Sequence, residues 1–192
     1  MEMTLQEQNE RKAQSYKLIL WFAMVSMVMM FAGLTSAYVV SSSRADWLKD
    51  FQMPSAFFMS TAVIILSSIT FLLARKAIKQ NNQPLTTKWL LATLVLSIAF
   101  VVLQFVGFNQ IVAMGYFFTG SESTITTSFL YIVAILHLAH LFGGLIALSI
   151  IIYNHFKQKY NATQTLGIEL GEMFWHFLGI LWILLFLFFF FY

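Results

Sequence analysis

Cysteine is absent from the 192 residues, proline occurs only twice, and charged residues make up only 10% of the chain. The lack of thiols excludes disulfide bonds, thiolate metal sites and cysteine nucleophiles. An ordinary soluble domain has roughly a quarter of its residues charged. Hydrophobic residues make up 59% of this chain, which is more than a soluble core of this length can hide. The composition therefore predicts that much of the surface faces lipid.

Five runs with few or no charges are long enough to span a bilayer, which requires about 20 residues. They cover residues 18–40, 56–74, 89–115, 126–153 and 168–192. Unpaired backbone cannot face lipid, and the runs lack the alternation typical of barrel strands. We therefore expect an all-α integral membrane protein, a bundle of five transmembrane helices in a single domain, 1–192. The first run has no cleavage site after a short apolar core, so it predicts a retained helix and not a signal peptide.

The basic residues indicate an orientation. Nine of the eleven Lys and Arg residues fall in the N-terminal tail and in the second and fourth loops, while Arg44 and Lys49 fall on the other side. The positive-inside rule then predicts a cytoplasmic N-terminus and a periplasmic C-terminus. Because the cations lie between apolar runs and form no patch, a nucleic acid is not expected as a partner, despite the net charge of +3.

Ionisable groups inside a membrane are costly, so they are the first candidates for function. Glu169, Glu172 and His176 recur at i, i+3 and i+7, which places them on one helix face. His137 and His140 are three residues apart and are also expected to share a face. On the third run, Gln104 is expected to be the most buried polar residue.

Three interpretations of these groups remain open. The acidic face of the last run could collect protons at its cytoplasmic end, although only His140 and His137 would continue the path. A haem b could bind between His140 and His176, but their expected depths, roughly 20 Å and 12 Å from the cytoplasmic ends, are not level. The third interpretation, which we prefer, is that the histidines hydrogen-bond between helices at about 1 kcal/mol each or less.

Other residues indicate where helices could pack closely against one another. Gly33 with Ala37, and Gly143 with Ala147, form pairs of small residues four apart, which allow close contact between helices. The phenylalanines that end the chain are expected to face lipid or a partner helix.

Five short motifs lie in order along nearly the whole chain. Residues 174–182 read Phe-Trp-His-Phe-Leu-Gly-Ile-Leu-Trp, and Gly-Ile-Glu precedes them at 167–169. Upstream, a His-Leu-Ala-His segment at 137–140 is followed by two glycines, and a Phe-x-x-x-Gln pattern ends at Gln104. The first run contains Ser26 and then Phe-Ala-Gly at 31–33, followed by Tyr38.

In this order the motifs resemble subunit III of the haem–copper respiratory oxidases. Its signatures include Tyr-Trp-His-Phe-x-x-x-x-Trp, Gly-Phe-Glu and His-Gly-x-His-Val-x-x-Gly, and its short bacterial form has five helices. The positions that match a family motif include the following residues of this sequence: Gly33, Tyr38, Gly143, Trp175, Phe177 and Trp182.

The resemblance implies an accessory subunit of a cytochrome c oxidase in aerobic respiration, with no cofactor or active site of its own. Haems and copper are expected in partner subunits. Subunit I is the expected main contact and is stabilised by this chain, subunit II is a second partner, and phospholipids lie in a cleft between helices. Membership of a larger respiratory supercomplex stays open. The bacterial inner membrane is the expected location. The alternatives are the same subunit of a quinol oxidase or nitric oxide reductase, and a stand-alone haem b anchor.

Three positions depart from the family pattern. Met27 stands where the family has a carbodiimide-reactive glutamate, Gly179 where it has an aspartate, and Gly107 where it has a glutamate. With fewer buried carboxylates, assisted proton uptake is less strongly implied and a structural role is more so. Glu169 and His176 are the best candidates for a role carried over from the family.

Overall fold

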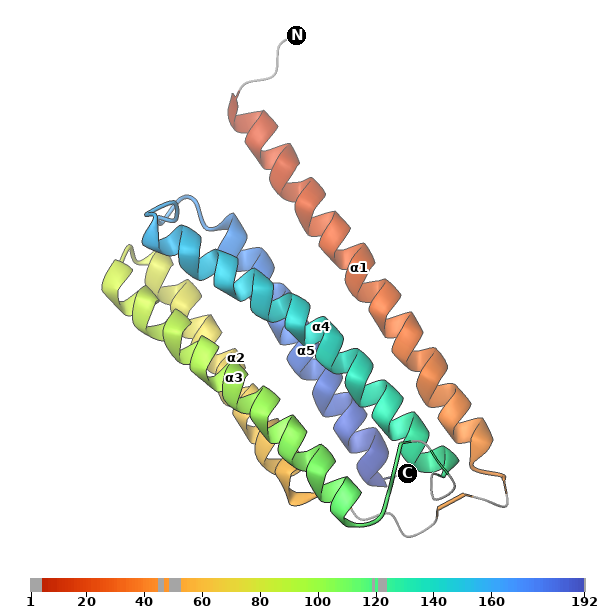
Figure 1. The fold of residues 1–192 in the computed structure, drawn as a ribbon. Coiled ribbons are helices and arrows are strands. Elements are labelled where there is room, and N and C mark those ends of the chain that lie inside the picture. The colour runs from red at the N-terminus through yellow and green to blue at the C-terminus, as the bar shows by residue number, and fades with distance from the viewer. Residues whose placement is uncertain (1–4, 45–46, 49–52, 119, 121–123, 192) are drawn as a thin grey trace.

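The computed structural model describes residues 5–44, 47–48, 53–118, 120 and 124–191, and its architecture is five long helices (Figure 1). They are α1 (Leu5–Ser41), α2 (Ser55–Lys79), α3 (Gln83–Ala113), α4 (Ile125–Phe156) and α5 (Leu166–Phe191). All five are long and apolar enough to cross a membrane. The prediction of an all-α chain with five spanning helices is therefore confirmed.

Several helices continue past the apolar runs that predicted them. α1 begins at Leu5, well before residue 18, because residues 5–17 are rich in Glu, Gln, Lys and Arg, which are good helix formers, and contain no Gly or Pro. α2 extends to Lys79 through the good helix formers Arg75, Lys76 and Ala77, and α3 starts at Gln83. An apolar run marks the part of a helix inside lipid, whereas the helix itself continues into water. Residue 192, the end of the fifth run, lies outside the described residues.

The helix starts carry standard signals. Pro84 lies in the first turn of α3, where its missing N–H costs nothing, and the Asn82 side chain accepts from the backbone N–H of Leu85. At the start of α4, Thr124 and Thr127 form a reciprocal capping box. These caps hold the short α2–α3 turn and the entry to α4.

α1 packs on the bundle through one narrow stripe of side chains. Only 11% of its most apolar window is buried, against 33% or more in each of the other helices, so α1 is peripheral. In Figure 1 its N-terminal end projects past the other four. The buried and half-buried positions recur every three or four residues, a spacing typical of left-handed helix packing. They include Ala13, Lys17, Leu20, Met24, Met27, Phe31, Leu34 and Tyr38.

The close helix contacts use different glycines from those predicted. A Cβ on Gly144 would lie 2.9 Å from a methyl of Leu178 and 3.3 Å from the Trp175 ring. In contrast, Gly33 and Gly143 are exposed, and nothing lies within 4 Å of a Cβ built on either. The prediction that their faces make close contacts was wrong within this chain. A shift of one residue turns the face of a helix by about 100°, so neighbouring glycines have opposite roles.

The terminal phenylalanines were only partly predicted correctly. Phe190 and Phe191 are exposed, as expected, but Phe186 is buried. The rings of Phe188 and Phe189 lie 5.4 Å and 5.2 Å from the Tyr38 ring, which also meets Trp47 and Phe129. This aromatic cluster joins the C-terminal end of α5 to the C-terminal end of α1.

The adjacent glycines of α4 give a matched test of the packing. We expect Gly144→Val to destabilise the bundle by about 1–3 kcal/mol, because the added methyls overlap Leu178 and Trp175. Gly143→Val meets open space and should change stability by less than about 0.5 kcal/mol. Reversible unfolding in mixed detergent micelles measures both, and equal losses would contradict this packing.

Candidate functional site

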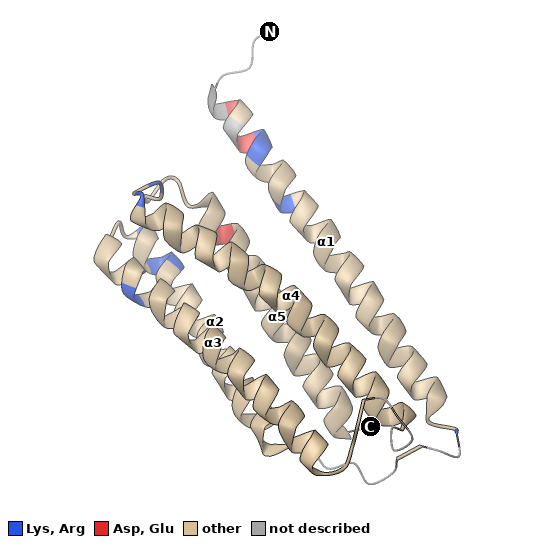
Figure 2. Ribbon diagram, in the orientation of Figure 1, with Lys and Arg blue, Asp and Glu red and all other residues tan. Residues whose placement is uncertain are grey.

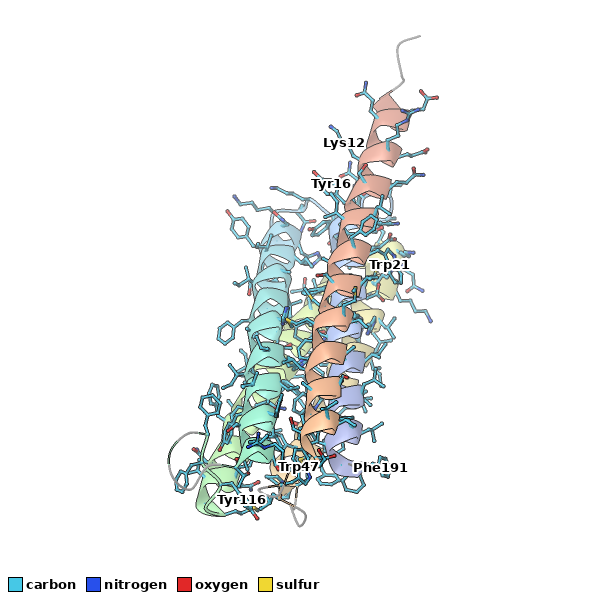
Figure 3. All side chains as sticks on the ribbon, turned by 90° about the vertical axis from the view of Figure 1, so that its right-hand side faces the viewer. Lys12, Tyr16, Trp21, Trp47, Tyr116 and Phe191 are labelled. Atoms are coloured by element: carbon cyan, nitrogen blue, oxygen red, sulfur yellow. The ribbon has the colours of Figure 1, made fainter. Side chains whose placement is uncertain are left out.

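The charged residues gather at one end of the bundle, as Figure 2 shows. This end holds the turn between α2 and α3 and the loop between α4 and α5. We call it the basic end, because its cations are Arg75, Lys76, Lys79, Lys88, Lys157 and Lys159. The N-terminal part of α1 brings further cations to the same end: Lys12, labelled in Figure 3, and Lys17, which contacts Glu169.

Glu169, in the first turn of α5, receives cations from two other helices. Its Oε2 lies 3.2 Å from Lys17 Nζ of α1, and its Oε1 lies 3.5 Å from both Arg75 Nη2 and Lys79 Nζ of α2. The Thr165 hydroxyl also donates to Oε1. The three cationic side chains are 36–49% exposed, so each pair alone contributes little. Together they attach α1 and α2 to the start of α5.

Glu172, one turn further, is buried, with 3% of its side chain exposed. Arg75 Nη1 lies 3.0 Å from its Oε2, so the same guanidinium contacts both carboxylates of α5. His176 Nε2 lies 3.6 Å from the other oxygen, Oε1, which is too long for a hydrogen bond. The structure therefore brings together Glu169, Glu172 and His176 as the helical spacing predicted, and adds Arg75 as the partner of both acids.

Arg75 is a site residue that was not predicted from the sequence, where it contributed only to the predicted orientation. The available signal was that two carboxylates on one membrane helix need a cation at the same depth. Arg75 and Lys79 are four apart, so they share a face at the end of α2.

Deeper in the bundle, α2 carries a row of hydroxyls that receive hydrogen bonds from other helices. The indole N–H of Trp175 donates to Ser67 at 3.0 Å, and that of Trp182 donates to Thr61 at 3.1 Å. From α3, the Gln104 amide donates to Ser60 at 2.9 Å. Gln104 is fully buried, as predicted. The two motif tryptophans thus fix α5 against α2, a role that residue spacing alone did not reveal.

The histidines do not act as expected. His137 is fully buried among the rings of Phe31, Phe100 and Trp182, and no described residue forms a hydrogen bond with its ring. His140 Nδ1 donates to the Leu136 carbonyl of its own helix at 2.7 Å.

The prediction that His137, His140 and His176 hydrogen-bond between helices is therefore wrong for the described part of the chain. That bond is made by His155, which was overlooked: its Nε2 lies 2.8 Å from the Thr87 hydroxyl of α3. His140 lies beside Phe31 of α1, whereas His176 lies beside Glu172. This arrangement does not favour the two as axial ligands of one haem. Among the described residues, no group of three or more His, Asp and Glu could hold a metal ion.

Packing explains the residues at two further motif positions, Gly167 and Phe177. A Cβ on Gly167 would overlap the hydroxyl of Tyr160, which folds over the start of α5. Burial raises the pKa of this tyrosine above its ordinary value. The ring of Phe177 is half-buried and packs against the cluster of Phe31 and Leu181.

Comparison with known proteins agrees with these motifs. The family model described as cytochrome c oxidase subunit III matches residues 2–192. The chain belongs to the cytochrome c oxidase subunit III family. Among its relatives, cytochrome c oxidase subunit 3 of Alkalihalophilus pseudofirmus is 30% identical over 67% of this chain and 62% of that protein. The match therefore spans less than two thirds of that relative.

Other relatives have a different name. Cytochrome bo(3) ubiquinol oxidase subunit 3 of Pseudomonas aeruginosa is 26% identical over 86% of this chain and 79% of its own length. The protein of the same name from Buchnera aphidicola is 29% identical over 88% and 89%. This subunit III is thus a multi-pass membrane protein of the haem–copper oxidase family, whose members are subunits of multi-subunit complexes.

The structure gives physical reasons for two of the three departures in this subunit III. A Cβ on Gly107 would lie 2.7 Å from the Phe57 ring, so a glutamate there would displace that ring. Met27 lies half-buried on the stripe by which α1 packs on the bundle, where a thioether can fill an irregular gap. The third position, Gly179, lies against Ser68 of α2.

Removing the central cation tests the site. We expect Arg75→Met to destabilise the bundle by about 2–3 kcal/mol, because it leaves the Glu172 carboxylate buried and unpaired. Lys79→Met removes only an exposed partner of Glu169 and should cost less than about 1 kcal/mol. Unfolding in detergent measures both, and adding Glu172→Gln to Arg75→Met should restore most of the loss. An Arg75→Met protein as stable as Lys79→Met would contradict the network.

Proposed function

We propose that the chain is an accessory subunit III that stabilises the haem-bearing subunit I of a terminal oxidase and contributes no redox centre of its own. The observation that carries this proposal is the family match over residues 2–192. The site geometry supports it, because the carboxylates, indoles and amide described above connect helix to helix. Partners are then subunits I and II, together with phospholipids at the cationic surface of the basic end.

A secondary role in proton uptake would depend on three side chains of α5. Glu169 is partly exposed at the basic end, Glu172 is buried one turn deeper, and His176 follows one turn beyond it. Protons could move from water through these three groups over about 10 Å along α5. The next histidine, His137, is enclosed by aromatic rings, so this face would serve a neighbouring subunit and not a path across the chain.

For the electron donor we propose cytochrome c, and a quinol is the second candidate. The first is supported by the family model, which is described as cytochrome c oxidase subunit III and matches residues 2–192. The second is supported by the alignments with ubiquinol oxidase subunits, which match 86% and 88% of the chain, against 67% for the A. pseudofirmus cytochrome c oxidase subunit. The donor binds other subunits, so the copper ligands of the co-purified subunit II distinguish the two.

We further propose that the basic end faces the cytoplasm of a bacterial cell, with the chain in the inner membrane. The support is the distribution of the cations, which, among the residues that the structure describes, lie almost entirely at that end. Alkaline phosphatase fused after residue 191 should then be active in the periplasm, and the same fusion after Gln80 should be inactive. The reverse pattern would refute the orientation.

The function is tested by purifying a tagged chain in mild detergent and recording a reduced-minus-oxidised spectrum of what co-purifies. We expect a haem-bearing subunit I in the eluate, because a bundle of this family functions within a complex. A copper-binding Cys and His set in the accompanying subunit II indicates cytochrome c, and its absence indicates a quinol. A colourless chain without partners would refute the proposal, and haem without partners would favour the anchor.

The same preparation separates the two roles. If Glu169 supports only the helix contacts, Glu169→Gln should lower the amount of assembled oxidase and leave turnover per haem unchanged. If it collects protons, assembly should be normal and turnover should fall, most strongly at high pH, where protons are scarce. Lys76→Met, which changes a cation with no described contact to either carboxylate, is the control.

A further inference from the structure

α2 and α5 leave between them a groove of about 300 Å³ that opens on the outside of the bundle. Its walls are apolar and exposed: Ile65, Ile69 and Ile180 have 43%, 47% and 58% of their surface uncovered. Two polar side chains, Ser68 and His176, also line it. Gly179 forms part of its floor, where it is buried against Ser68 of α2.

The orientation of His176 is determined by the carboxylate beside it. Its Nε2 is buried and lies 3.6 Å from Glu172 Oε1, while Arg75 occupies the other carboxylate oxygen. A proton on Nε2 is therefore favourable, because it points at negative charge. In the tautomer with its proton on Nε2, Nδ1 carries the lone pair and is a hydrogen-bond acceptor. The described residues give it no donor, although a quarter of the side chain is exposed.

Depth distinguishes the groups that could satisfy this nitrogen. His176 lies seven residues along α5 from Glu169, about 10 Å further into the apolar layer. Lipid headgroups belong at the level of Lys17, Arg75 and Lys79, near Glu169. An acyl chain could fill the groove but has no donor to offer. A transmembrane helix can do both, since it fills the groove with apolar side chains and can carry a hydroxyl or amide.

We propose that the α2–α5 groove is the surface on which a transmembrane helix of a neighbouring oxidase subunit packs, with a hydroxyl or amide side chain of that helix donating a hydrogen bond to His176 Nδ1. This inference rests on the proposed function, because it requires the chain to be part of an oxidase complex. It adds which face of the bundle makes the contact and what chemistry the partner helix presents.

Photo-crosslinking in native membranes tests the surface. Benzoylphenylalanine replaces Ile180 in the groove or, as a matched control, Val95 on α3, which is 65% exposed and does not line the groove. We expect the Ile180 position to crosslink to another oxidase subunit and the Val95 position to crosslink to lipid only. In the Ile180 background, His176→Leu should reduce the yield by about threefold, as loss of one interhelical hydrogen bond does in a membrane. His176→Gln, whose amide can accept that bond, should keep the yield.

The outcomes are separable. Crosslinks to lipid alone at Ile180, or subunit crosslinks at Val95 only, would overturn the groove as the contact surface while leaving the proposed function intact, provided that oxidase subunits still co-purify. An unchanged yield in His176→Leu would overturn the hydrogen bond. If no oxidase subunit co-purifies in any background, the proposed function and this inference fall together.

Discussion

The contact between Arg75 and the two carboxylates of α5 is the interaction on which the basic end depends. Glu172 is almost fully buried on a helix made largely of Leu, Ile and Phe, where an unpaired charge would be expensive. One guanidinium contacts Glu172 and Glu169 together and therefore sets the height of α2 relative to α5. Lys17 then adds α1 to the same group of charges. Lys17, Arg75 and Glu169 are far apart in the sequence, and their contacts connect α1, α2 and α5 at the basic end.

Below the charged layer, uncharged polar contacts continue the alignment set by Arg75. Lipid is as apolar as a leucine side chain, so helices in a membrane gain little from hydrophobic burial and are held by close packing and interhelical hydrogen bonds. Here the indoles of Trp175 and Trp182 reach the hydroxyls of Ser67 and Thr61, six residues apart on α2. Gly144 lets α4 come close to the Trp175 ring that makes the first of these bonds.

The packing is uneven around the bundle, and this unevenness fits a subunit of a larger complex. α1 buries only a narrow stripe, and the groove between α2 and α5 leaves a quarter of the His176 side chain exposed, about 10 Å along α5 from Glu169. Among the described residues, none donates a hydrogen bond to this histidine. The helix proposed to pack in the groove would provide one, which would connect the family assignment to a particular face of this chain.

The sequence by itself determined the number of spanning helices, the end at which the cations gather and the shared face of Glu169, Glu172 and His176. All three follow from local physics, namely the length of apolar runs and the period of a helix. Only the tertiary structure showed that Arg75 is the partner of both acids, that Gly144 and not Gly143 makes the close contact, and that His155 bonds across helices where His137 does not. These outcomes depend on how each helix is rotated about its axis and on its height relative to its neighbours. Both are set by contacts between residues far apart in the chain, and spacing within one helix carries no information about them.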